Sequence, residues 1–391
     1  MKKHYIQAGV CLLVSLAVTV ITGLNFIKVR EVSKIYPGEG VTEIKMLSDY
    51  FDGIAGTNGD TEIYVLKGSE AGGKVLVLGG THANEPSGYL SAITFIENAK
   101  VTAGTVYIIP YTNRSAMTHN DAQEGSPQYI TIPTANGVRQ FRYGSRATNP
   151  IDQWPDSDVY VHAASGQKLS GSETRNINRA YPGRADGTFT EKVAFAIAEF
   201  IRTEQIGLTF DLHEASPEYP VINATVAHEK SMNVASLGML ELQLEGIDMS
   251  LEPSPVNFHG LTHRELGDYT DTIPLLMETA NASQGRFRGA TDAELALTGK
   301  DHFYVLSAKL GMLYVPYDEN GHPIEERVGR HLQGLIEYIN AYSTLYPESA
   351  VTFEGVPTYQ ALFAESDGSD LGGARLGQYL GNMPASDAIT D

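Results

Sequence analysis

A short apolar segment followed by a glycine turn constrains the fold of this 391-residue chain more than any other feature. Residues 75–78 (VLVL) are apolar and partly β-branched, which is typical of a buried strand. A Gly-Gly pair ends this strand, and His82 and Glu85 follow it. Pro86 then suits the first turn of a helix. We therefore expect a buried strand that delivers an imidazole and a carboxylate, two common zinc ligands, to the edge of a sheet.

The segments that follow extend this pattern to an α/β fold. Residues 89–99 have helical spacing, and residues 105–111 indicate a second strand, so the three segments together predict a parallel crossover unit. Residues 206–212 and 273–277 predict a third and a fourth buried strand. The remaining expected elements are an edge strand over 61–66 and helices over 191–202, 234–245 and 328–342. The prediction is a three-layer α/β/α fold with a mixed, largely parallel sheet.

The first 35 residues differ from the rest of the chain. Lys2 and Lys3 precede a long apolar stretch over residues 8–27, which is typical of a secretory signal or a membrane anchor. The stretch is long for a signal peptide and lacks a convincing cleavage pattern, so we expect an uncleaved anchor, with a cleaved signal as the alternative. Either way, the bulk of the chain is expected outside the cytoplasm. The only cysteine, Cys11, lies inside this stretch, which excludes thiolate chemistry downstream.

Polar residues with metal-binding chemistry stand at the predicted ends of three strands. His82 and Glu85 follow the first strand, His213 follows the third, and Glu278 follows the fourth. If these strands are parallel, their carboxyl ends meet at the edge where open α/β sheets bind ligands. Two imidazoles and one carboxylate form a three-ligand zinc set, and Glu278 is then placed to take a proton from water.

A second polar cluster lies between the predicted strands. Residues 174–179 (TRNINR) contain two arginines and two asparagines, and a Pro-Gly turn after them favours a loop. Arginine binds a carboxylate in a two-pronged manner that lysine does not reproduce. This segment is therefore predicted to hold an anionic group of a substrate.

Four segments, taken in order, resemble the zinc carboxypeptidase superfamily and, within it, the succinylglutamate desuccinylase/aspartoacylase branch. They are GGTHANEP, RNINRAYPG, DLHE and LMET, and the resemblance covers about residues 74–289. It implies that one zinc ion is held by His82, Glu85 and His213.

The same resemblance implies roles for further residues. Asn178 and Arg179 would bind the substrate carboxylate, and Glu278 would be the general base and acid. The branch also uses an upstream arginine to polarise the scissile carbonyl. The expected position holds a glycine here, so Arg175 is predicted to take this role. The competing arginines are Arg139, Arg142 and Arg146.

Other polar residues near the motifs receive separate predictions. Tyr269, shortly before the fourth strand, is predicted to donate a hydrogen bond to the reaction intermediate. Glu214 is expected to point away from the neighbouring His213, because side chains alternate along a strand. His259 and His263 are expected in a loop, because a glycine lies between them, so they are predicted to line the pocket.

The predicted function is zinc-dependent hydrolysis of the amide bond of N-acyl amino acids or a related small carboxylate. An exported carboxypeptidase acting on peptides, including cell-wall peptides, is the alternative. A membrane-tethered binding protein without activity is the second alternative. The net charge of −19 would repel a phosphate backbone, so no nucleic acid is expected as a partner.

The chain is expected to divide into three parts. Residues 1–35 form the signal or anchor with a linker, residues 36–345 the hydrolase domain, and residues 346–391 an acidic, glycine-rich tail or small appended element. Within the domain, residues 117–174 are expected to form an elaborated loop that bears short hairpins near the site.

Overall fold

The computed structural model describes residues 2–121 and 125–389. Its helices are α1 (Lys2–Lys28), α2 (Pro86–Asn98), α3 (Phe189–Glu204), α4 (Met232–Leu244), α5 (Thr262–Tyr269), α6 (Ala293–Thr298), α7 (His302–Lys309) and α8 (Ile324–Leu345). The strands of its main sheet are β1 (Glu43–Met46), β2 (Glu62–Lys67), β3 (Glu70–Leu78), β4 (Lys100–Ile109), β9 (Leu208–Ala215), β10 (Ala224–Ala227), β11 (Ser250–Pro253), β12 (Ile273–Ala280) and β13 (Thr352–Glu354).

The main sheet is mixed, with a parallel centre. Its strands follow the order β1-β2-β4-β3-β9-β12-β10-β11, and β13 pairs with β4 outside this path. The central strands β4, β3, β9 and β12 are parallel to one another, whereas β2 and β10 run antiparallel to their central neighbours. The carboxyl ends of β3, β9 and β12 therefore meet at one edge of the sheet.

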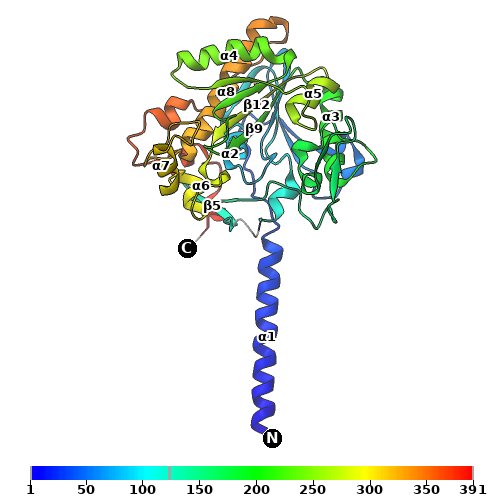
Figure 1. Ribbon diagram of the computed structural model, residues 1–391, viewed down its shortest axis with the longest axis vertical. Coiled ribbons are helices and arrows are strands. Elements are labelled where there is room, and N and C mark those ends of the chain that lie inside the picture. The colour runs from blue at the N-terminus through cyan, green and yellow to red at the C-terminus, as the bar shows by residue number, and fades with distance from the viewer. Residues whose placement is uncertain (1, 122–124, 390–391) are drawn as a thin grey trace.

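Helices cover both faces of this sheet, which confirms the predicted three-layer fold (Figure 1). Along β3, Val75 and Val77 pack in a hydrophobic cluster with α2, α4 and α8. Leu76 and Leu78 point to the opposite face and pack in a second cluster with α3. This alternation explains the uninterrupted apolar run of β3, because a strand buried on both faces needs apolar side chains at every position.

Most predicted elements are confirmed, although their ends shift by a few residues. The β3-α2-β4 crossover is present with Pro86 in the first helical turn, and Thr188 forms a capping box with Glu191 at the start of α3. The segment expected as an edge strand, β2, is wrong in that role, because the short strand β1 pairs outside it. Strand β9 also continues past the predicted end to Ala215, because it stays paired with β12.

The long polar segment contains the expected hairpins. Strands β5 (Tyr129–Thr134) and β6 (Gly137–Arg142) form one, and β7 (Val159–Val161) and β8 (Lys168–Ser170) form the other. In the C-terminal segment, β13 joins the central sheet through β4. Leu362, Leu376 and Leu380 of this segment are buried in the same cluster as α8. The tail thus shares the hydrophobic core of the sheet.

The N-terminal helix α1 extends away from the folded body as a single long rod (Figure 1). The most apolar 18-residue window within Lys3–Lys28 has a mean hydropathy of 2.3, and none of this window is buried inside the protein. By length and composition this helix is able to cross a membrane.

Candidate metal centre and cavity

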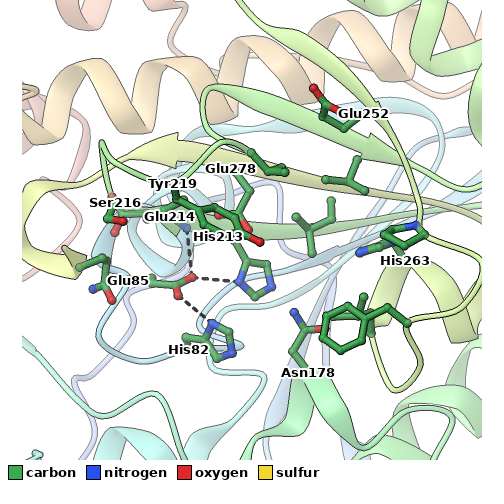
Figure 2. Close-up of a pocket in the computed structure, with 18 of the residues that line it drawn as sticks. His82, Glu85, Asn178, His213, Glu214, Ser216, Tyr219, Glu252, His263 and Glu278 are labelled. Atoms are coloured by element: carbon green, nitrogen blue, oxygen red, sulfur yellow. Dashed lines mark hydrogen bonds and ion pairs between the residues drawn. The ribbon is translucent and has the colours of Figure 1, made fainter. Parts of the chain in front are cut away.

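The residues predicted at three strand ends lie together in the structure (Figure 2). His82 and Glu85 lie in the turn between β3 and α2, where Glu85 is the N-cap residue of the helix. His213 of β9 pairs in register with Glu278 of the neighbouring β12. Parallel pairing puts both side chains on the same face of the sheet, beside the turn that carries the other two.

His82, Glu85 and His213 form a compact buried group. The Nδ1 atom of His82 lies 2.7 Å from Oε1 of Glu85, and the Nδ1 atom of His213 lies 2.9 Å from Oε2 of the same carboxylate. One ligand atom from each residue lies within 4.8 Å of the others. Two imidazole nitrogens and one carboxylate oxygen at this separation match the donor set of a catalytic zinc site.

The second nitrogen of each imidazole ring faces an oxygen atom. Nε2 of His213 lies 2.8 Å from Oδ2 of Asp211, and Nε2 of His82 lies 3.0 Å from Oδ1 of Asn176. The contact with Asn176 holds the ring proton of His82 on Nε2, so that its Nδ1 carries the lone pair that a metal ion needs, whereas the contact of His213 with Asp211 is an ion pair without hydrogen-bond geometry. The oxygens beyond the predicted ligands therefore support the same assignment.

The electrostatics of the group favour a cation. Burial raises the pKa of Glu85, but His82 and His213 outweigh it and hold that pKa below its usual value. Burial lowers the pKa of His213, but Asp211 and Glu85 outweigh it and raise that pKa well above its usual value. Two buried carboxylates thus surround one imidazole, and a divalent cation would satisfy their excess negative charge.

Glu278 faces the same space and has an unused oxygen. Among the residues that the structure describes, no hydrogen-bond partner reaches its Oε2 atom, although that atom is buried and the residue is half-buried. Burial raises the pKa of Glu278 to about 8. A carboxyl group with a pKa near neutrality is suited to both accepting and donating a proton.

These residues line a cavity of about 490 Å³, and the predicted clamp residues line it as well. The Oδ1 atom of Asn178 accepts a hydrogen bond of 2.8 Å from the backbone N–H of Thr262. This contact leaves the amide N–H₂ of Asn178 as the polar group available to the cavity. The guanidinium of Arg179 stacks on the ring of Phe258 at 4.9 Å from its centroid.

Arg146 is the arginine that lies beside the predicted ligands. Its Nη1 atom lies 3.3 Å from Nδ1 of His82 and 3.4 Å from Oε1 of Glu85, and its side chain is 43% exposed. The sequence offered Arg146 only as one of three competitors to Arg175. It lies in the long polar segment, for which no periodic pattern fixed a position.

The structure does not bring Arg175 into the cavity. Its guanidinium donates two hydrogen bonds to Asp156, of 2.6 and 3.0 Å, and a third of 2.7 Å to the carbonyl oxygen of Thr148. All three hydrogen bonds are made within the loop, so the guanidinium of Arg175 is oriented toward the loop and not toward the cavity. This corrects the sequence-based placement of Arg175.

Tyr269 is also outside the cavity. It is the last residue of α5, close to the start of β12 at Ile273, whereas Glu278 lies five residues further along that strand. At about 3.3 Å per residue, Ile273 and Glu278 are roughly 16 Å apart along the strand. The side chain of Tyr269 is 46% exposed, and the sequence-based placement of this residue is likewise corrected.

The predictions for three further residues agree only in part with the structure. Glu214 points away from the predicted ligands, because its carboxylate pairs with the buried Arg327 at 2.5 Å. His263 lines the cavity as predicted, but it lies in α5 rather than in a loop. His259 does precede that helix and bonds to Glu265 at 2.8 Å, but it is not among the residues that line the cavity, contrary to the prediction.

Two residues that support the site were missed in the sequence. Asp211 accepts a hydrogen bond of 2.6 Å from Thr81 and a second from the hydroxyl of Thr262. The alternation of strand side chains was a usable signal for Asp211, which lies two residues before His213 on the same face. Nothing in the local pattern marks Thr262, whose partners are distant in sequence.

No protein-family model matches the chain, and no curated protein matches it. Among solved structures it is similar to the ectoine utilization protein EutE (DoeB) from Ruegeria pomeroyi, with 20% identity, a TM-score of 0.37, and coverage of 58% of this chain and 55% of that one. A succinylglutamate desuccinylase from a Silicibacter strain gives 19% identity, a TM-score of 0.36, and coverage of 58% and 55%.

The product-bound cell shape determinant protein Csd4 from Helicobacter pylori gives 10% identity, a TM-score of 0.44, and coverage of 78% of this chain and 59% of that one. This chain thus spans somewhat more than half the length of each of these proteins. One of them bears the name of the branch that the motifs resemble. The overlap is too slight to carry an argument about activity.

Proposed function

We propose that this protein is a zinc-dependent amide hydrolase that deacylates N-acyl amino acids or a related small carboxylate. One observation carries the proposal. A buried His-Glu-His group, a carboxyl group with a buried oxygen that has no hydrogen-bond partner among the described residues, and an Asn-Arg pair all face one cavity, although they come from segments far apart in the sequence. A structural metal site would not require the last two features.

One zinc ion would be held by His82, Glu85 and His213. When bound, the ion supplies Lewis acidity, which polarises a carbonyl group and acidifies water. The residues fit this role, because both imidazoles present Nδ1 to the shared space, Nε2 of His82 is bonded to Asn176, and Nε2 of His213 lies 2.8 Å from a carboxylate oxygen of Asp211. The protein's own side chains would transfer the proton, bind the substrate and stabilise its negative charge.

Glu278 would act first as a base and then as an acid. Its free Oε2 atom would accept a proton from the attacking water as the carbon–oxygen bond forms, and later deliver it to the nitrogen of the leaving amine. Asn178 and Arg179 would hold the carboxylate of the released amino acid. Arg146 would stabilise negative charge on the scissile carbonyl oxygen, the role that the sequence gave to Arg175.

A carboxypeptidase acting on peptides is the second candidate, and the shape of the cavity favours it. The cavity continues to both sides of the predicted ligands, with Ser216 and Tyr219 on one side and Glu252 and His263 on the other (Figure 2). A substrate with residues on both sides of the scissile bond would fill this space. We also propose that α1 anchors the domain to a membrane outside the cytoplasm, where peptides of the cell envelope would be available.

Metal content and cleavage together test the function. We would measure zinc in the purified full chain, in the His82→Ala/His213→Ala double variant, and in His302→Ala as a matched control on the exposed surface of α7. We expect one zinc ion per chain in the wild type and in the control, and none in the double variant. Glu278→Gln should retain zinc and lose cleavage of N-acyl amino acids and peptides, and the better substrate class distinguishes deacylase from peptidase.

Two results would reject the hydrolase. Equally little metal in the wild type and the double variant, after zinc is offered, would leave the membrane-tethered binding protein as the better account. Full cleavage by Glu278→Gln would remove the proposed base and, with it, the mechanism.

A further inference from the structure

The cavity extends from the predicted metal ligands across three strands toward the edge of the sheet. Leu276 of β12 pairs in register with Val226 of β10, and Val226 pairs with Glu252 of β11. Register partners project from the same face, and all three residues line the cavity. Because neighbouring strands are about 4.8 Å apart, Glu252 lies roughly 10 Å beyond β12.

This part of the cavity, here called the distal arm, has an apolar floor and an acidic end. Leu276 and Val226 form the floor, and Phe258 and two prolines of the 253–258 segment add apolar walls. Glu252 and His263 lie at its far end, on the side of the ligands opposite Ser216 and Tyr219 (Figure 2). The distal arm therefore fits a chain that is apolar along its length and polar at its tip.

The carboxylate of Glu252 is available for a ligand. Within residues 2–121 and 125–389 the structure shows no hydrogen bond or ion pair to this side chain, which is partly exposed. Two cations lie near this strand: Arg330, which reaches the carbonyl oxygen of Asp248 and pairs with Glu326, and Arg264, which reaches the carbonyl oxygen of Ser254. Its guanidinium is already paired with Glu229 at 2.7 Å and Asp268 at 2.8 Å, so it does not neutralise Glu252.

His263 does not supply the missing positive charge. Its ring is buried, and Nδ1 lies 2.8 Å from the hydroxyl oxygen of Ser254. Burial lowers the pKa of His263 to about 3, so the imidazole is neutral at physiological pH. Glu252 thus leaves a net negative charge at the end of the distal arm.

We propose that the distal arm binds the side chain of the amino acid that the enzyme releases, and that Glu252 selects long side chains ending in a cation, such as that of lysine. The inference rests on the proposed function, which places the carboxylate of this amino acid on Asn178 and Arg179. The cavity then has the positive charge of Arg179 beside Phe258 and the negative charge of Glu252 at the tip of the distal arm. A basic amino acid presents the complementary pair, with its methylene groups against Leu276 and Val226.

Matched substrates isolate the charge at the tip of the side chain. Nα-acetyl-lysine and Nα-acetyl-norleucine share four side-chain carbons and differ in the terminal ammonium group, and the same pair is made as the last residue of a tripeptide. We expect the zinc-loaded full chain to prefer lysine by about tenfold in kcat/KM, as expected for a charge-assisted hydrogen bond to a partly exposed carboxylate. The preference should decrease as salt is added.

Substitutions of Glu252 test whether this residue produces the preference for lysine. Glu252→Gln should bring the lysine-to-norleucine ratio close to one while kcat/KM for norleucine stays within about twofold. Glu252→Lys should favour Nα-acetyl-glutamate over both. Glu245→Gln is the matched control, because it removes the same charge from an exposed position after α4 and should leave the ratio unchanged.

Binding of the products separates this inference from the proposed function. We would titrate lysine and norleucine into the zinc-loaded full chain by calorimetry and repeat the titrations with Glu252→Gln. If no substrate is cleaved, the hydrolase proposal fails, but tighter binding of lysine that depends on Glu252 would still support the distal arm. Equal affinities or equal kcat/KM values for the two side chains in the wild type, or a ratio that Glu252→Gln does not change, would overturn it.

Discussion

A buried ion pair connects strand β9, which carries His213, to α8, the longest helix of the folded body. Oε1 of Glu214 on β9 lies 2.5 Å from Nη1 of Arg327 on α8, and both side chains are 0% exposed. The other carboxylate oxygen accepts hydrogen bonds of 3.1 Å from the backbone N–H of Ser87 and 3.0 Å from Nδ2 of Asn281. Four segments thus meet at one carboxylate, directly beside His213.

Removing one partner should be costly, because the other charge stays buried. Arg327→Met keeps most of the apolar stem but removes the guanidinium, and breaking a buried pair in this way costs about 3–5 kcal/mol. At about 2.1 cal/mol/K per residue, a chain of 391 residues unfolds with an entropy of roughly 0.8 kcal/mol/K. The expected fall in Tm is therefore about 4–6 °C.

The assay is thermal unfolding of the full chain in a mild detergent, followed by circular dichroism. Glu214→Gln/Arg327→Met should lose less stability than Arg327→Met alone, since no unpaired charge remains. The matched control is Glu39→Gln, because its partner Lys100 and Glu39 itself form an exposed pair, and its Tm should not change. A Tm of Arg327→Met equal to that of the wild type would refute the reasoning, as would strictly additive losses in the double variant.

Two further predictions concern stability. Burial raises the pKa of Glu204, but its hydrogen bonds outweigh this effect and lower that pKa from 4.5 to about 2. The largest hydrogen-bond contributions come from Lys45 and Tyr50. The stability that Glu204 contributes is complete above pH 4.5 and is lost as the pH falls toward 2. The difference in Tm between the wild type and Glu204→Gln should therefore shrink over this pH range. A difference in Tm that stays constant would contradict this prediction. Gly88→Ala would put a Cβ atom 2.4 Å from the carbonyl oxygen of Leu212, so it should lower the free energy of unfolding by about 1–3 kcal/mol and reduce zinc binding at His213. The control is Gly381→Ala, which has open space around it and should change neither stability nor zinc binding. A normal Tm and a normal zinc content in Gly88→Ala would argue against this close approach.

The sequence was most informative where strands are buried on both faces. The apolar runs of β3, β9 and β12 have no other stable location than the centre of a sheet, so the polar residues that end them had to gather at its edge. This is why His82, Glu85, His213 and Glu278 were predicted as one group, and the structure places all four around one cavity. The prediction depended on topology and needed no knowledge of contacts.

Residues on irregular segments were less predictable for a physical reason. Arg146 lies within the long polar segment and Arg175 directly after it, and the sequence favoured Arg175, with Arg146 as one of its competitors. Their directions depend on partners far along the chain, since Asp156 holds one and the predicted ligands attract the other. Short strands such as β10 and β11 also lack a periodic pattern, so Glu252 could not be placed in the cavity beforehand.

The register of the sheet joins these two groups of residues into one substrate site. Asp211, Leu276, Val226 and Glu252 form one row across four neighbouring strands, and His213 and Glu278 belong to the next row toward the carboxyl edge. The first row begins at the carboxylate that holds the His213 ring and ends at the carboxylate that we propose selects the substrate. Because a shift of one residue in β12 would turn Leu276 and Glu278 to the opposite face, the proposed catalysis and the proposed specificity depend on the same pairing. A substitution that alters this register should therefore remove both functions together, whereas Glu252→Gln should alter only specificity.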